Sequence, residues 1–177
     1  MAFIPEDGTG LENANSYMSL AAADAHHADR GHTEWASVST ALREAALVRA
    51  TDYIDKRFGH RFRGYKRTRD QALQWPRFAA VGNDRFLLPP IPAQLLKATA
   101  EYALRALTNT PLAPDNDAVG LRANREKVGP IETETRINVA SSKSALLDPT
   151  SIPDYPEADL WLMELIESTM SRTLVRG

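Results

Sequence analysis

The residues best suited to do chemistry in this sequence are the positively charged ones between positions 56 and 69. This stretch, called the basic segment below, has seven cationic side chains and no carboxylate: Lys56, Arg57, Arg61, Arg63, Lys66, Arg67 and Arg69. Phe58, Phe62 and Tyr65 are interleaved with them. The whole chain has 21 Lys and Arg residues and a net charge of −2, so a third of its positive charge lies here. We therefore expect the basic segment to meet something anionic.

Three partners fit the basic segment: nucleic acid, an acidic protein surface, or the chain's own carboxylates. Cations with interleaved aromatic rings match single-strand binding, in which backbone charge is neutralised and bases stack on the rings. In the alternative, Phe58 ends a helix, Phe62 and Tyr65 pack inward, and the charged groups are solvated above buried stems. The basic excess is local, whereas nucleic-acid-binding domains commonly show it over the whole domain.

Two further groups of residues are candidates for contacts. Trp75, Pro76 and Arg77 follow the basic segment, and a tryptophan at the foot of a loop favours a core or interface anchor over a base-stacking platform. Near the C-terminus, residues 156–170 predict a helix that is apolar nearly all round, which is not stable alone on a surface. We expect this helix to dock on a neighbouring copy or another protein through Trp161, Leu165 and Ile166. The alternative is that it folds back onto the helix predicted over 92–108.

The sequence favours no enzyme class. It has no cysteine, hence no disulfide and no thiolate ligand or nucleophile. The histidines at 26, 27, 32 and 60 are not spaced as a ligand set, and we expect surface or capping roles for them. No catalytic residues, metal or cofactor are therefore predicted. No apolar run approaches the ~18 residues of a membrane span, and the N-terminus does not resemble a secretion signal, so we expect a protein made in the cytoplasm without membrane contact.

The elements that position these residues are mostly helices. Apolar residues at three- and four-residue steps predict helices over roughly 17–30, 40–58 and 92–108, besides the one over 156–170. Alternating residues predict a strand near 128–139, which needs a second strand from 121–128 or from a neighbour. The predicted fold is mainly α: a small helical bundle with one or two β-strands and an extended C-terminal arm ending in a helix. We divide the chain into a body over 1–139 and a linker with the arm over 140–177.

Several blocks of the sequence carry a family resemblance. They are EDGTGLENANSYMS (6–19), AALVRATDYID (45–55), RFGHRFRGYKRTRDQALQWPR (57–77), PIPAQLLKATAEYALRAL (90–107) and EKVGPIETE (126–134). In this order they cover most of residues 6–134. They resemble tailed-phage and prophage proteins labelled DnaT-like single-stranded-DNA-binding proteins, which look like head–tail connector (adaptor) proteins of long-tailed phages.

The connector resemblance implies a structural protein of the virion, made in the host bacterium and placed at the head–tail interface. It implies a homo-oligomeric ring, closed by repeated contacts between about twelve copies. The ring would bind the portal protein on one side and the next connector or tail-completion protein on the other, with double-stranded genome DNA passing through. The label instead implies a single-stranded-DNA-binding protein that uses residues 56–69. In a ring we expect most of these cations to face protein carboxylates, because many bound phosphates would hold the DNA that must pass.

Overall fold

The structure is a computed structural model, and it describes residues 2–108, 112, 123–128, 131–136 and 155–167. The fold is mainly α-helical, as predicted. The chain forms two compact units, of which the first joins Met1–Leu112 to Tyr155–Gly177 and the second is Ala113–Asp154. The C-terminal residues therefore group with the helical unit, whereas the sequence had placed them with the linker after residue 139.

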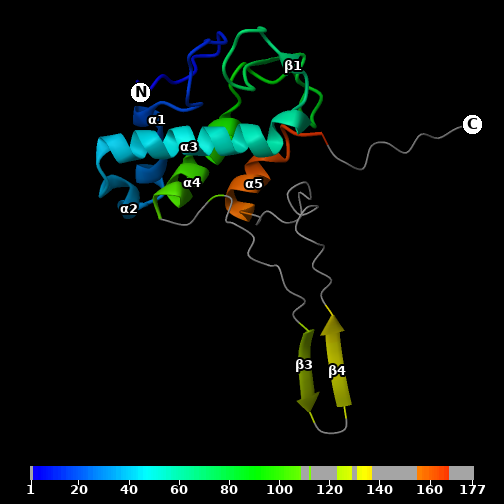
Figure 1. Ribbon diagram of the computed structural model, residues 1–177. Helices are drawn as coiled ribbons and strands as arrows, with labels where there is room; N and C mark the ends of the chain where they lie inside the picture. The colour runs from blue at the N-terminus through cyan, green and yellow to red at the C-terminus, as the bar shows by residue number, and fades with distance from the viewer. Residues whose placement is uncertain (1, 109–111, 113–122, 129–130, 137–154, 168–177) are drawn as a thin grey trace, which may run out of the picture. The chain divides into compact units, whose positions relative to one another are not determined.

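The helical unit contains five α-helices in its described residues. They are α1 (Leu20–Asp29), α2 (Thr33–Ala36), α3 (Thr40–Phe58), α4 (Ala93–Leu107) and α5 (Pro156–Leu162), and a 3-10 turn, η1 (Gly59–Arg61), follows α3. Helix α3 has the predicted bounds, and α4 differs from its prediction by one residue at each end. In Figure 1, α3 spans the unit, with α4 and α5 along one side and the loops that carry β1 on the other.

The core of this unit lies where α3, α4 and α5 pack together. Leu47 and Ile54 of α3 are fully buried, as are Leu95 and Tyr102 of α4, which confirms the predicted apolar stripes at these positions. Leu96 and Leu107, predicted in the same stripe of α4, are half-buried. The stripe of α3 does not reach its first turn, where Leu42 is 54% exposed. Burying such large side chains contributes on the order of 2 kcal/mol each, so the three helices make one stable platform.

Helix α5 ends earlier than predicted, at Leu162 rather than near residue 170. The chain beyond it pairs with the middle of the basic segment: Phe62 and Ile166 form an antiparallel bridge, the Arg63 N–H donates to the Leu165 carbonyl at 3.0 Å, and the Glu167 N–H donates to the Arg61 carbonyl at 2.8 Å. These backbone partners replace those that a longer helix would supply.

The expected docking residues at the C-terminus need a correction. Leu165 and Ile166 are buried within their own chain, beside Phe62, so they are core residues and are not presented to another molecule. Trp161 is half-buried, and the Lys97 ammonium lies 4.2 Å from its ring centroid. Burial in the monomer thus accounts for Leu162, Leu165 and Ile166, whereas Leu160 and Met163 are exposed, at 65% and 61%.

The second unit contains one antiparallel hairpin in its described residues. Strand β3 (Ala123–Val128) pairs with β4 (Ile131–Arg136), in a register that runs from Ala123 opposite Arg136 to Val128 opposite Ile131. The predicted strand near 128–139 is confirmed, and its partner is the internal segment that the sequence offered. No helix among the described residues has both the length and the apolar character needed to cross a bilayer.

Candidate nucleic-acid interface

The loop after the basic segment is anchored to the helical unit by Trp75, as predicted. Its side chain is fully buried, with the ring of Phe62 at 5.9 Å in an edge-on contact. The backbone N–H groups of Gln74 and Trp75 donate to the Tyr17 hydroxyl, at 3.1 and 3.3 Å. The Gln74 N–H also lies 3.0 Å from Asp55 of α3. These contacts fix the loop at a defined position over the end of α3.

Asp55 and Tyr17 form a buried polar pair beneath this loop. The Tyr17 hydroxyl donates to the Asp55 carboxylate. Burial raises the pKa of Asp55 to about 6, although the hydrogen bonds from Tyr17 and Gln74 lower it. Burial, followed by the charge of Asp55, also raises the pKa of Tyr17 well above its usual value. The pair can therefore take up a proton at mildly acidic pH while it holds the loop.

The basic segment and the anchored loop together form a short β-ribbon. Strand β1 (Tyr65–Lys66) pairs antiparallel with β2 (Arg77–Phe78), so that Tyr65 lies opposite Phe78 and Lys66 opposite Arg77. Gly64 makes this close approach possible. Its φ is +74°, and a Cβ atom there would lie 2.4 Å from the Phe78 carbonyl oxygen. A side chain at position 64 would thus push the two strands apart.

The ribbon presents two aromatic rings to solvent. The side chains of Tyr65 and Phe78 are 75% and 71% exposed, and directly opposite residues of an antiparallel pair project from the same face. Phe58 and Phe62, by contrast, are buried. The inward-packing alternative is therefore right for Phe58 and Phe62 and wrong for Tyr65. Two large exposed rings side by side on one face form an apolar patch of the kind that can contact a binding partner.

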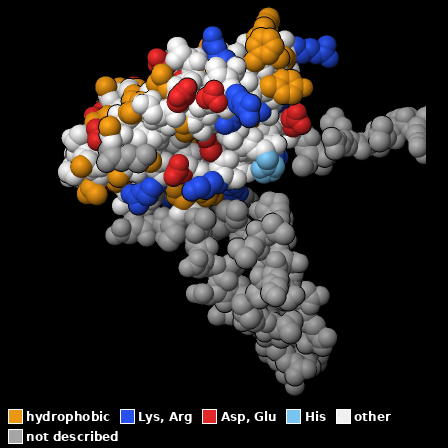
Figure 2. Space-filling view, turned by 45° about the horizontal axis from the view of Figure 1, so that its top comes forward, with side chains coloured by type: hydrophobic (Ala, Val, Ile, Leu, Met, Phe, Trp, Pro, Cys, Tyr) orange, Lys and Arg blue, Asp and Glu red, His pale blue; other side chains and the backbone are white. Residues whose placement is uncertain are grey.

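A third exposed ring lies on the loop that follows β2. Phe86 is 74% exposed, and the loop that carries it is well defined. Val81 and Leu87 form an antiparallel bridge, the Gly82 N–H donates to the Phe86 carbonyl at 2.9 Å, and the Leu88 N–H donates to the Ala80 carbonyl at 2.8 Å. Figure 2 shows hydrophobic side chains gathered at the upper end of this face, with Lys and Arg side chains next to them.

Three arginines of this region are engaged within the chain. Arg57 donates to the Tyr53 hydroxyl at 2.6 Å and lies 3.8 Å from Asp159. Arg63 donates to the Ile166 and Val81 carbonyls and to the Asn83 side chain. Arg77 donates to the carbonyls of Phe62, Arg63, Gly64 and Gln74. The basic segment therefore meets its own chain in part, but through carbonyl oxygens more than through the carboxylates that the sequence suggested.

The remaining cations are more accessible. Lys56, Lys66, Arg67 and Arg69 are exposed, as is Arg85 on the Phe86 loop, while Arg61 is half-buried. Lys56 lies 3.9 Å from Asp52, Lys66 is 3.4 Å from the Gln71 carbonyl, and Arg67 donates to the Gly8 carbonyl at 3.2 Å. No hydrogen bond or ion pair joins the Arg69 or Arg85 side chain to the described residues. Accessible positive charge thus lies at the end of β1 and directly after it, at Lys66, Arg67 and Arg69, and at Arg85 on the Phe86 loop.

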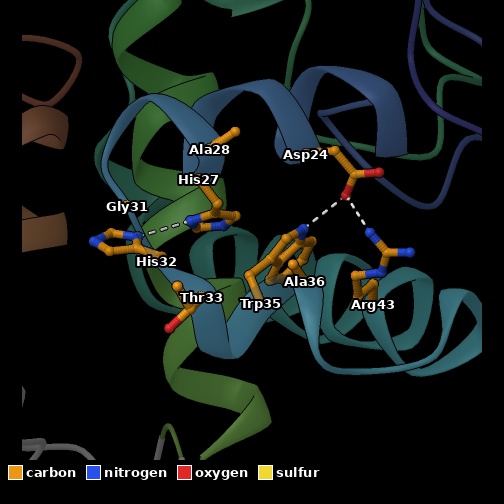
Figure 3. A pocket seen from close by; sticks show the side chains of 9 residues that line it. All are labelled: Asp24, His27, Ala28, Gly31, His32, Thr33, Trp35, Ala36 and Arg43. Carbon is orange, nitrogen blue, oxygen red and sulfur yellow. Dashed lines mark hydrogen bonds and ion pairs between the residues drawn. The ribbon is translucent and has the colours of Figure 1, made fainter.

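A second polar cluster surrounds a recess between α1 and α2 (Figure 3). Gly31, with φ of +69°, turns the chain so that Nδ1 of His32 lies 3.0 Å from Nδ1 of His27. The His27 ring also lies against Trp35, with centroids 4.3 Å apart. Burial, together with the positive charge of His26, His32 and Arg30, lowers the pKa of His27 to about 4.

The histidines differ from the sequence expectation. His26 and His27 are buried rather than on the surface, and His26 Nε2 lies 2.8 Å from Glu101 Oε1. The rings of His27 and His32 meet although the two residues are five positions apart, because the turn after α1 breaks the helical spacing. Among the residues that the structure describes, no group of three or more His, Asp or Glu side chains is placed to hold a metal ion.

Two features of the ribbon were missed by sequence reasoning. The pairing of Tyr65 with Phe78 joins residues 13 positions apart through strands of two residues each, which are too short to show a periodic pattern. Phe86 lay in a stretch interpreted only as a loop. The one available signal was the density of aromatic and basic residues from 56 to 86, since loops commonly carry binding residues on a rigid scaffold.

Exposed rings beside accessible cations are features that surfaces for single-stranded nucleic acid have in common. Comparison with known families agrees with a surface of this class. Residues 1–177 match the family described as "Putative DnaT-like ssDNA binding protein", and the chain belongs to that family. No curated protein and no solved structure matches the chain.

Proposed function

We propose that this protein binds single-stranded DNA on the β1–β2 ribbon. The observation that carries the proposal is the exposed pair of opposed rings, Tyr65 and Phe78, in the middle of the most basic part of the chain. The description of the family supports the same ligand.

The chemistry of the ribbon favours unpaired bases. An aromatic ring can stack on a base only when the base face is free, and such stacking stabilises a complex by about 1–3 kcal/mol per base. The cations at Lys66, Arg67 and Arg69 then lie within the same short segment for the phosphates. Because a base stack and a phosphate contact need no particular sequence, we expect little discrimination between sequences.

The expected affinity is modest and dependent on salt. If three or four of the exposed cations each neutralise one phosphate, log K falls with log salt with a slope of about −2 to −3, at roughly −0.7 per contact for single strands. So few contacts give an affinity no tighter than micromolar at about 0.15 M salt. Weak binding of this kind suits a protein that acts in several copies along a strand.

The test is fluorescence anisotropy with a labelled oligo(dT) of about 15 nucleotides, a length that covers one typical binding site. We expect Tyr65→Ala and Phe78→Ala each to weaken binding about 5- to 150-fold, which corresponds to the loss of one stack. Leu160→Ala is the matched control, because Leu160 is a similarly exposed apolar residue, at 65%, on α5. Equal affinity of all three variants and the wild type would refute the proposal.

As a second candidate function we propose the head–tail connector suggested by the sequence resemblance. The observation that favours it is the β3–β4 hairpin, which forms a compact unit separate from the helical one. A two-stranded hairpin alone is marginally stable in water, so its backbone edges favour pairing in an assembly. This function would make the protein a ring that binds a portal protein and lets genome DNA pass.

The two proposed functions can be distinguished by measuring the mass of the particles that the protein forms. Light scattering or native mass spectrometry of the purified protein, alone and mixed with a portal protein, should give a closed ring or a portal complex if it is a connector. A monomer that does not bind the portal protein but binds oligo(dT) supports single-stranded-DNA binding. A ring that does not bind oligo(dT) supports the connector function.

A further inference from the structure

We infer that Arg63, although it lies in the middle of the basic segment, is a positioning residue and not a phosphate contact. Its side chain donates hydrogen bonds that hold in place the elements on which the exposed rings lie. This inference rests on the proposed single-stranded-DNA function, and it divides the cations of that surface into two sets with different roles.

The contacts of Arg63 join separate segments of the chain. The Nε–H donates to the Ile166 carbonyl at 3.1 Å, one terminal nitrogen donates to the Val81 carbonyl at 2.9 Å, and the other donates to the Asn83 side-chain oxygen at 2.6 Å. Its backbone N–H donates to the Leu165 carbonyl and its carbonyl accepts from Arg77 Nε at 2.8 Å. One residue therefore links the C-terminal segment, the Phe86 loop and strand β2.

The geometry requires an arginine. The three nitrogens of one planar guanidinium donate hydrogen bonds to three acceptors on two segments. A lysine ammonium, which is a single group at the end of a flexible stem, cannot donate to all three acceptors in this fork-shaped arrangement. These bonds use three of the five N–H donors of the guanidinium and hold it against its own chain, so a phosphate could meet only the remaining two. Arg77 acts in the same way from β2, because its donors meet three carbonyls at residues 62–64 and the carbonyl of Gln74.

Positioning matters here because the exposed rings sit on short elements. Strands of two residues and a nine-residue loop over 80–88 have few hydrogen bonds of their own. When the Arg63 fork is lost, Phe86 and the ribbon should sample several arrangements, and binding must then order them again. Affinity should fall without any change in the number of phosphates contacted.

The salt slope of binding separates the two roles, since it counts phosphate contacts. We expect Arg63→Lys and Arg63→Gln to weaken oligo(dT) binding by a similar factor, on the order of tenfold, with the slope of the wild type. Arg69→Gln, the control for a phosphate contact, should make the slope shallower by about 0.7. Asn83→Ala removes one acceptor of the Arg63 fork without changing any charge, and it should weaken binding with an unchanged slope.

A second readout tests the inference without DNA. Amide hydrogen exchange reports local opening, and in Arg63→Lys the Gly82 and Leu88 amides should exchange on the order of tenfold faster while those of α3 keep their rates. The inference is overturned if these amides are unaffected, or if Arg63→Gln lowers the salt slope while Arg63→Lys binds normally. If the wild type does not bind oligo(dT), the proposed function fails, and the exchange rates still decide whether Arg63 positions the loop.

Discussion

Replacing His27 by phenylalanine should make the protein less sensitive to acid. His27 is fully buried, and its pKa is lowered from 6.5 to about 4. A proton that binds the unfolded chain below pH 6.5 is therefore excluded from the folded chain until pH 4. The stability of the wild type is lost as the pH falls through this window, and this one group accounts for about 2 kcal/mol between pH 7 and pH 5.

Phenylalanine is a suitable replacement because it keeps a ring against Trp35 but cannot titrate. The assay is urea unfolding at pH 7 and pH 5 at constant ionic strength. As the pH falls from 7 to 5, we expect the free energy of unfolding of the wild type to fall by about 2 kcal/mol relative to that of His27→Phe, whatever the substitution costs at pH 7. His60→Phe is the control, because His60 is exposed, and it should keep the wild-type difference.

Titration of Asp55 changes the free energy of unfolding in the opposite direction to that of His27. Its pKa is raised to about 6 in the folded protein, so it stabilises the fold by about 1 kcal/mol as the pH falls from 7 to 5. In His27→Phe, only the Asp55 contribution to the pH dependence of stability remains of these two. If the free energy of unfolding of His27→Phe and that of the wild type show the same pH dependence, the conclusion that His27 is neutral in the folded protein is wrong.

Three other substitutions or deletions follow from the fold and the site. Trp75→Ala should cost about 3–5 kcal/mol in chemical unfolding, because it empties a fully buried site; an unchanged midpoint would show that Trp75 is no anchor. Deleting residues 156–177 should destabilise the helical unit, since it removes the buried Leu162 and Leu165, and circular dichroism melting equal to that of the full chain would contradict this. Asp55→Asn should leave the loop anchored at pH 7, and urea unfolding at pH 7 and pH 5 should show that it lacks the stabilisation of about 1 kcal/mol that Asp55 contributes at the lower pH.

The helical part of the fold could be predicted from the sequence because its signal is local. Helix α3 has 19 residues, enough turns for an apolar stripe to show. The strand β4 was equally clear as an alternating pattern. The end of α5 could not be predicted, because it depends on backbone pairing between Leu165–Glu167 and residues 61–63, about a hundred positions earlier.

The candidate site was only half predictable. The basic segment indicated anion binding, but composition cannot tell which cations form their hydrogen bonds within the folded chain. Arg63 and Arg77 bond carbonyl oxygens, and any residue supplies a carbonyl, so no sequence pattern marks those partners. The exposure of Tyr65 likewise depends on the tight turn at Gly64 and on the register with Phe78, both of which are tertiary features.

The most direct test of the central claim is photochemical crosslinking of the wild-type protein to oligo(dT), followed by mass spectrometry of the crosslinked peptides. A base stacked on a ring is in contact with it, so the account predicts crosslinks at Tyr65 and Phe78 on the β1–β2 ribbon. It also predicts that excess unlabelled single strand suppresses these crosslinks and that duplex DNA competes poorly. Crosslinks that map to other parts of the chain, or none under conditions in which the protein binds the strand, would contradict the claim that the ribbon is the single-stranded-DNA site.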